Sequence, residues 1–271
     1  MRTWLYAPVI AAGLLSLTAC DIEDFHGSAR YSKDFHYSYP LAANGKLSVE
    51  GFNGSIEISS WDQNTVDVSG TKYARTQESA DDIQVTADHT PTAVSIHASR
   101  PSIGRGNEGV KFVIKAPRGV VLDRITTSNG AIRATDGAGP ARLKTSNGAI
   151  HVAALKGSLE ANTSNGHIEA DLEEANGPVR LDTSNGSVEL RLPGKLDDDV
   201  RVHTSNGGIT VRTAGDLNAR VSARTSNGKI RSDLDVRSRS EVEKHRLEGT
   251  IGAGGPLLDL TTSNGSIRIT R

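Results

Sequence analysis

The sequence is poor in cysteine and in aromatic residues. It holds one cysteine, Cys20, and aromatic residues make up 4% of its 271 positions. A single cysteine excludes a disulfide within the chain, and no group of cysteines and histidines has the spacing of a zinc site. Because no aromatic residue follows Phe112, the C-terminal half must build its core from Ile, Val, Leu, Ala and Thr. This composition favours thin β layers.

Neither sign of charge is in excess. The chain has 31 Lys and Arg residues against 32 Asp and Glu residues, so the charge balance gives no support for a nucleic-acid partner. A length of 271 residues allows one large domain or two small ones.

The first twenty residues have the pattern of an export signal. Arg2 precedes an apolar run from Trp4 to Leu17, which is short for a membrane span. The run ends in Leu17-Thr18-Ala19-Cys20 and resembles the signal peptide and lipobox of a bacterial lipoprotein. We therefore predict a signal peptide over residues 1–19 and lipidation of Cys20 with acyl chains such as palmitate, which would anchor the protein to a membrane. The alternatives are an ordinary secretory signal with a chance cysteine, or a buried N-terminal helix.

The residues after Cys20 bear on location. Asp21 resembles the signal that retains some lipoproteins at the inner membrane, so it favours the periplasmic side of that membrane. The outer membrane and the cell surface are the alternatives within the cell envelope. Residues 20–40 are polar, with scattered aromatic residues and no clean period, and we predict that they form a tether.

One tetrapeptide, Thr-Ser-Asn-Gly, occurs seven times between residues 127 and 265. Its asparagines are separated by 18, 18, 20, 21, 21 and 37 residues, and a fixed period is the signature of a repeat architecture. The last interval is about two periods, so we predict that one coil near Arg237–Gly252 has lost the tetrapeptide. The asparagines are Asn129, Asn147, Asn165, Asn185, Asn206, Asn227 and Asn264, and the glycines that follow them are Gly130, Gly148, Gly166, Gly186, Gly207, Gly228 and Gly265.

Residues 41–119 read as an N-terminal β-rich part of the same repeat domain, and residues 120–271 as the Thr-Ser-Asn-Gly array. Asn53-Gly54 lies in a frame like that of the later copies, which indicates a degenerate first copy. Strand signals dominate the rest of this part, and only Tyr73–Asp82 has a composition that suits a short helix.

Apolar residues alternate on both sides of each asparagine, as they do on a strand with one buried face. A second turn signal, such as Gly139-Pro140, precedes several of the asparagines by about nine residues. Each repeat therefore has two short strands and two corners. The predicted buried positions are Ile125, Leu143, Ala161, Leu181, Val202, Ala223 and Leu260 before the asparagines, and Ile132, Ile150, Ile168, Val188, Ile209, Ile230 and Ile267 after them.

Two architectures fit this pattern. Each Asn-Gly could close an antiparallel hairpin, or each repeat could be one coil of a parallel β-solenoid. We favour an all-β fold of the second kind, with coils of about 18–21 residues and one short helix in the N-terminal half. A hairpin tolerates several residue pairs at its turn, whereas stacking explains why all four residues recur. Stacked asparagines can form a ladder, the Thr and Ser hydroxyls can do likewise, and glycine adopts left-handed conformations freely.

A family resemblance supports this choice. The frame from Val49, through Lys111–Val120, to the last copy at Thr262–Ile267 resembles the bacterial family of β-strand repeat proteins known as putative adhesins, a domain of unknown function. The resemblance covers about Leu41–Arg271 and implies a β-solenoid exposed in the cell envelope. It implies no catalytic residues, and "adhesin" in that name is a label of analogy.

Few residues could carry chemistry. Glu169 and Glu189 are predicted at the same outward position of adjacent coils, as a carboxylate pair of a polysaccharide-active enzyme would be, but their column is otherwise mixed in charge. Asp197-Asp198-Asp199 is an acidic run at a corner that could hold a cation, but a calcium site needs several convergent oxygens, and we expect an exposed loop. His151, His167 and His203 lie at different offsets from their asparagines. We therefore predict no catalytic residue, no metal and no cofactor.

Three functions remain in view. The first is a non-enzymatic envelope lipoprotein whose solenoid is a structural or interaction module for an unknown protein or glycan partner. The second is a partner protein in envelope-stress or other signalling on the same scaffold. The third is a polysaccharide-active β-helix enzyme, against which the lack of aromatic residues argues. The Thr-Ser-Asn row could itself bind a periodic ligand, but we expect an internal ladder.

Overall fold

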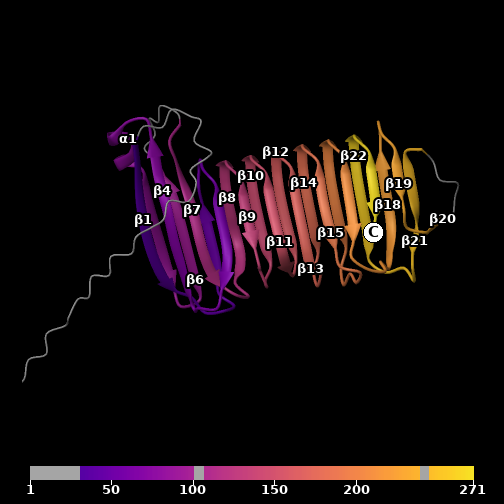
Figure 1. The fold of residues 1–271 in the computed structure, drawn as a ribbon, viewed down its shortest axis with the longest axis horizontal. Helices are drawn as coiled ribbons and strands as arrows, with labels where there is room; N and C mark the ends of the chain where they lie inside the picture. Colours follow the sequence, from indigo (N-terminus) through magenta and orange to yellow (C-terminus); the bar gives the residue numbers. More distant parts are fainter. Residues whose placement is uncertain (1–30, 101–106, 239–243) are drawn as a thin grey trace, which may run out of the picture.

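The protein is an all-β rod, which we describe from a computed structural model covering residues 31–100, 107–238 and 244–271. Two long sheets, one of eleven and one of twelve strands, run along the rod (Figure 1). Within the described ranges there is one helix, α1 (Gln77–Asp82), which lies inside the segment predicted to be helical. No described helix has the length and apolar character needed to cross a membrane. Cys20, Asp21 and the predicted signal peptide lie outside the described residues.

The eleven-stranded sheet consists, in spatial order, of β1 (Tyr31–Pro40), β4 (Thr65–Ala74), β7 (Gly109–Pro117), β3 (Ile56–Trp61), β9 (Ile132–Thr135), β11 (Ile150–Lys156), β13 (Ile168–Glu174), β15 (Val188–Leu192), β17 (Ile209–Thr213), β23 (Ile267–Thr270) and β19 (Ile230–Ser232). The twelve-stranded sheet consists of β20 (Val236–Ser238), β21 (Arg246–Ile251), β18 (Ala219–Thr225), β22 (Leu257–Asn264), β16 (Val200–Asn206), β14 (Val179–Asn185), β12 (Leu159–Asn165), β10 (Ala141–Asn147), β8 (Val121–Asn129), β2 (Lys46–Glu50), β6 (Ala93–Ser99) and β5 (Gln84–Thr90).

Each repeat forms one coil, with one strand in each sheet and the tetrapeptide at the corner between them. Neighbouring coils pair in parallel and in register, as Leu143 with Ala161 and Ile150 with Ile168 show. The parallel β-solenoid is therefore confirmed, and the hairpin alternative is wrong. The predicted apolar positions are buried between the sheets, except that Ile230 is only partly buried. Ile230 is more exposed because β19 is the end strand of its sheet.

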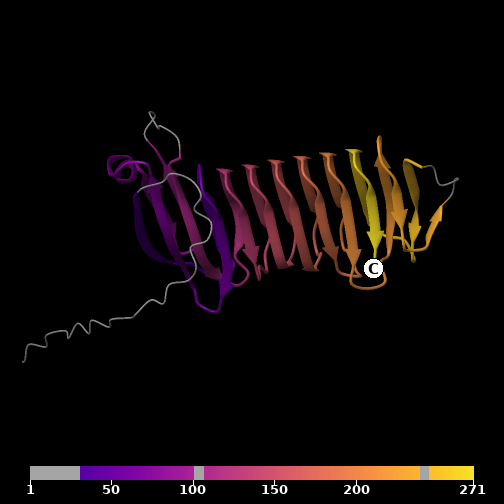
Figure 2. The same cartoon turned by 45° about the horizontal axis from the view of Figure 1, so that its top comes forward.

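The order of the coils departs from the sequence at the C-terminal end. We expected the long interval before Asn264 to hold a coil without the tetrapeptide, and this is wrong. Residues of that interval form β20 and β21, which pair antiparallel with each other, and β21 pairs antiparallel with β18. The chain then turns back, and β22 and β23 insert between the coils β16/β17 and β18/β19. The C-terminus accordingly lies inside the row of strands and not at its end (Figure 2).

The N-terminal end has the same kind of topology. The degenerate first copy is confirmed as coil β2/β3, which lies between strands β6 and β7 on one side and strands β8 and β9 on the other. Antiparallel strands β1, β4 and β5 flank this end. The tether prediction is wrong for residues 31–40, which form β1. Phe35, Tyr37 and Tyr39 alternate along β1, a strand signal that the sequence contains, and the Phe35 ring lies 5.9 Å from that of Phe112.

Candidate functional site

The tetrapeptide asparagines form a continuous ladder along one corner of the rod. The side-chain amide of each donates a hydrogen bond to the side-chain oxygen of the asparagine on a neighbouring coil, at 2.6–2.9 Å. Asn53 belongs to the ladder, and its own amide donates to the carbonyl of Glu108 at 2.8 Å. The side chains thus satisfy one another, which is the structural role that stacking predicts. In spatial order the ladder is Asn53, Asn129, Asn147, Asn165, Asn185, Asn206, Asn264 and Asn227.

The tetrapeptide threonines are buried and bond to the backbone of the next coil. Thr204, for example, is fully buried and donates from its hydroxyl to the carbonyl oxygen of Gly186 at 2.8 Å. We expected a hydroxyl ladder, but each threonine uses the neighbouring glycine carbonyl as its acceptor. The other donors are Thr127, Thr145, Thr163, Thr183, Thr225 and Thr262.

The tetrapeptide glycines are required for a different reason from the one predicted. None of these seven described glycines has a positive φ, so left-handed conformation does not explain them. A Cβ placed on Gly186 would overlap the carbonyl oxygen of Gly166 on the next coil, and each of the other six meets a glycine carbonyl in the same way. Only glycine allows the corners to stack this closely.

The two outward carboxylates considered for catalysis lie side by side but have separate partners. Glu169 and Glu189 are paired in register on β13 and β15. Glu169 is 3.2 Å from Nδ1 of His151, and Glu189 is 3.3 Å from Nη1 of Arg212. The partner of Glu169 lies on the coil on one side of the pair, and the partner of Glu189 lies on the coil on the other side. The pair therefore has the character of a mixed, solvated surface.

The acidic corner does not converge on a point either. Asp197 pairs with Lys195 at 2.8 Å and Asp199 with Arg201 at 3.1 Å, while Oδ1 of Asp198 accepts a hydrogen bond from the backbone N–H of Asp199. No group of three or more His, Cys, Asp or Glu side chains in the part of the chain that the structure describes could hold a metal ion.

A hollow lies on the outer face of the twelve-stranded sheet. It encloses about 610 Å³ over strands β2, β8, β10 and β12. At its floor β8 carries a β-bulge, because Leu122 pairs with Ala141 but Ile125 pairs with Leu143. The extra residue places two consecutive polar side chains, Asp123 and Arg124, between those buried positions. Bulges redirect side chains in this way, and we call this hollow the bulge groove.

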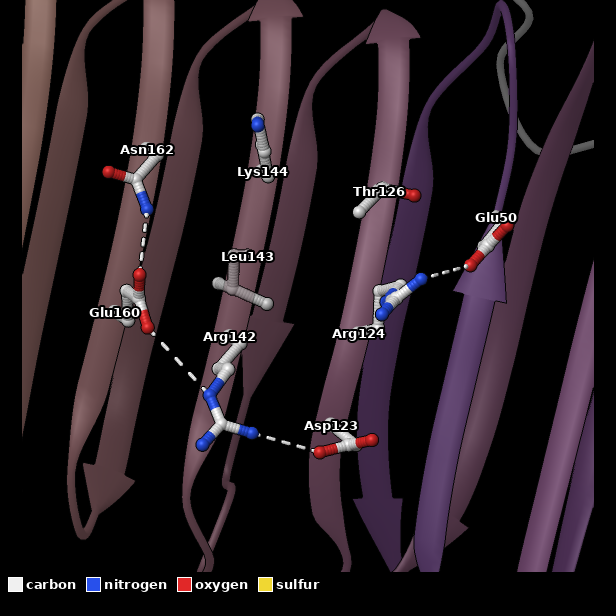
Figure 3. A pocket seen from close by; sticks show the side chains of 9 residues that line it. All are labelled: Glu50, Asp123, Arg124, Thr126, Arg142, Leu143, Lys144, Glu160 and Asn162. Atoms are coloured by element: carbon white, nitrogen blue, oxygen red, sulfur yellow. Dashed lines mark hydrogen bonds and ion pairs between the residues drawn. The ribbon is translucent and has the colours of Figure 1, made fainter.

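Ion pairs span the bulge groove (Figure 3). Nη1 of Arg124 donates to Glu50 at 3.2 Å, and Nη1 of Arg142 donates to Asp123 at 2.9 Å. Nε of Arg142 is also 3.7 Å from Glu160. Lys144 extends along the groove, and no other described residue serves it as a hydrogen-bond or ion-pair partner. The groove thus offers one uncommitted cation among fixed polar groups.

One acidic residue beside the groove is electrostatically unusual. Asp182 of β14 is paired in register with Asn162 on one side and His203 on the other. Partial burial raises the pKa of Asp182, and the nearby His203 and Arg180 counteract this only in part. The sequence analysis did not single out the groove or Asp182. The signal for the bulge was present, since two polar residues separate Leu122 from Ile125 where one would continue the alternation.

Comparisons with known proteins give one family match and several solved structures of low sequence identity. The sequence matches the family described as Toastrack DUF4097 over residues 41–216, and none of the curated proteins matches it. Similar solved structures include a putative adhesin from Bacteroides fragilis, which is 15% identical with a TM-score of 0.48 over 88% of this chain and 96% of that one. Others are a putative cell adhesion protein from Clostridium sporogenes (14% identity, TM-score 0.35, 88% and 99% covered) and a putative lipid binding protein from Parabacteroides distasonis (12%, 0.39, 88% and 97%).

Proposed function

The chain belongs to the Toastrack DUF4097 family, and on that premise we propose that it is a non-enzymatic lipoprotein of the cell envelope. Its rod is a structural and interaction module that is anchored through lipidated Cys20, and Asp21 favours the periplasmic side of the inner membrane as its location. The observation that carries the interaction role is the bulge groove, where Lys144 has no partner among the residues that the structure describes, while the acidic groups around it are paired. Such an arrangement suits a carboxylate-bearing ligand, on a glycan or on a protein surface.

The corner ladder supports a structural role for the repeats themselves. Because the asparagine and threonine side chains bond to neighbouring coils, they are committed to holding the rod together. Charge varies from coil to coil in the outward columns, as Arg133, His151 and Glu169 show, so a partner would be selected there. The separate partners of Glu169 and Glu189 argue for a non-enzymatic surface and against a glycosidase-like pair.

The interaction role is tested by charge reversal in the groove. Lys144→Glu should lower binding of an acidic polysaccharide or of an acidic membrane-sensor domain at least about tenfold, since it replaces an attraction with a repulsion. Lys229→Glu, a matched change on the coil that carries β19, should leave binding unchanged. Binding to whole cells or to glycan arrays would indicate a polysaccharide partner, whereas pull-down of a membrane protein would indicate a protein partner. Equal binding by the two variants would show that the bulge groove is not the binding site.

Two further measurements test the remaining parts. Cys20→Ser should move the protein from the membrane fraction to the soluble fraction, and retention of the variant in the membrane would contradict the lipid anchor. Purified protein should not cleave acidic polysaccharides. Cleavage that disappears in Glu169→Gln would replace the proposed role with an enzymatic one.

A further inference from the structure

The C-terminal coil, β22 and β23, fills a slot that the chain first leaves open. The segment Ala214–Asn218 passes from coil β16/β17 to coil β18/β19, and the strands of these two coils do not pair with each other. The slot between them is occupied only when residues 257–271 return to it. Asn264 then bonds to Asn206, 58 residues earlier, and receives a bond from Asn227, 37 residues earlier.

The inserted coil is bonded on both sides as fully as an interior coil. The backbone N–H of Gly207 donates to the carbonyl of Asn264 at 3.0 Å, and that of Asn227 donates to Ser263 at 2.8 Å. The Thr262 hydroxyl donates to Gly207 at 2.9 Å. Without the inserted coil, two parallel strand edges would face each other one coil apart, and such edges are templates for pairing.

A short glycine-rich hinge determines that the inserted coil comes from the same chain. Gly252, Gly254 and Gly255 have φ values of 58°, 82° and 151°, so the turn before β22 depends on backbone conformations that other residues rarely adopt. The turn is held to the rod by the backbone N–H of Ala253, which donates to Oδ1 of Asn218 at 2.7 Å. If this hinge opens, the strand pairing that holds residues 257–271 forms equally well in the slot of a second copy.

We propose that the slot also accepts the C-terminal coil of a second copy, so that two rods exchange β22 and β23 reciprocally. The exchanged coil makes every contact of the closed form, so the two states differ mainly in the hinge and in the entropy of association. The slot requires a Thr-Ser-Asn-Gly copy, because Gly265 stacks on Gly207 and the Thr262 hydroxyl reaches the Gly207 carbonyl. Residues 257–271 supply both features.

A matched pair of glycine variants tests the hinge. Gly254 and Gly119 have similar positive φ values, 82° and 78°, but only Gly254 precedes an insertable coil. Alanine at either position disfavours the native turn by a similar amount. Gly254→Ala should therefore raise the dimer association constant roughly tenfold or more, because opening both hinges relieves the strain twice. Gly119→Ala should leave the protein as monomeric as the parent.

Cross-linking identifies the exchange itself. His203 and Thr261 are neighbours in register on β16 and β22, so cysteines at both, in the full chain with Cys20→Ser, can be joined by a short bis-maleimide. Refolded at increasing concentration, the exchanged dimer gives a covalent two-chain band, whereas a closed monomer or a surface dimer gives only the one-chain band. The proposal fails if Gly254→Ala yields no more two-chain product than Gly119→Ala. If Gly254→Ala does not fold, absence of two-chain product at any concentration with the native hinge is equally fatal to it.

Discussion

The side-chain amide of Asn264 donates to the side-chain oxygen of Asn206 at 2.9 Å, although 58 residues separate the two. Asn227, which lies between them in sequence, is on the outer side of Asn264 in space. The ladder thus follows the stacking of the coils and not the order of the chain. Because coil β18/β19 has its inner partner only once the C-terminus has inserted, this end of the rod depends on contacts of long sequence separation, which form slowly.

Position in the ladder should determine what each asparagine contributes. Asn165 donates to Asn147 and accepts from Asn185, whereas Asn227 has a ladder bond only to Asn264. We expect Asn165→Ala to lower the free energy of unfolding by about 1–3 kcal/mol, and Asn227→Ala by about 0.5–1.5 kcal/mol, because one hydrogen bond contributes about that much. Urea titration followed by circular dichroism measures both. Equal losses would show that the contribution of an asparagine to stability does not depend on its position in the ladder.

The close approach of the corners gives a second prediction. Gly186→Ala should destabilise the rod by about 3 kcal/mol or more, since its Cβ would overlap the carbonyl oxygen of Gly166 and neither backbone can yield without breaking its pairing. Gly215→Ala is the control, because a Cβ there would lie 3.5 Å from the Cα atom of Gly194 on the neighbouring coil, which is an ordinary contact distance. Thermal unfolding of the two variants should separate them clearly. A tolerated Gly186→Ala would contradict the steric explanation.

The sequence was sufficient for the coil but not for the order of the coils. Identity of all four corner residues requires an environment that repeats, and stacking supplies one, as the Asn147–Asn129 bond illustrates. The alternation around each corner likewise predicted buried positions such as Ile150 and Leu181. The corner residues and the apolar alternation are local features, so the same residues that carry the pattern in the sequence also form the corner and the buried face in the structure.

Coil order is not local. Any copy of the tetrapeptide fits beside any other, so nothing in the residues around Asn264 distinguishes a place next to Asn206 from one beyond Asn227. The glycine requirement was also misassigned, because a turn signal and a close backbone approach both select glycine. The bulge at Asp123 and Arg124 was missed because the hollow that it forms depends on Glu50 and Arg142 of other strands.

The shifted acid Asp182 predicts a pH dependence. Since burial raises the pKa of Asp182 above that of an unfolded aspartate, the native state binds the proton more tightly, and the stability of the parent falls as the pH rises through the interval between the two pKa values. Asp182→Asn removes this loss. The free energy of unfolding of the variant should equal that of the parent below about pH 3 and exceed it near pH 7, because an unfolded aspartate has a pKa of about 3.9.

Asp62→Asn is the control of opposite sign. The hydrogen bond from Arg118 lowers the pKa of Asp62, so this carboxylate stabilises the native state above the unfolded pKa and the benefit is lost as the pH falls. Asp62→Asn should therefore weaken the protein near neutral pH and have no effect in acid. Urea midpoints measured from pH 3 to pH 7 give both comparisons. Parallel pH profiles for the two variants would contradict the assignment.

The burial of two isoleucines distinguishes the observed order of the coils from an order that follows the sequence. Ile267 belongs to the last copy of the repeat, so a rod that followed the sequence would place it in the exposed end coil. In the structure β23 lies between β17 and β19, and Ile267 is 1% exposed. Ile230, from an earlier copy, lies in the end strand β19 and is only partly buried.

Truncation of Ile267 should therefore destabilise the protein more than truncation of Ile230, which is the opposite of what a rod in sequence order would show. Ile267→Ala leaves a cavity between two packed coils and should cost about 2–5 kcal/mol, whereas Ile230→Ala loses contacts at a surface that water already reaches and should cost clearly less. Chemical denaturation gives the two values, and hydrogen exchange at β17 adds a local readout. Because β17 pairs directly with β23, Ile267→Ala should speed exchange in β17 while Ile230→Ala leaves it unchanged. The opposite ranking would place the last copy at the end of the rod.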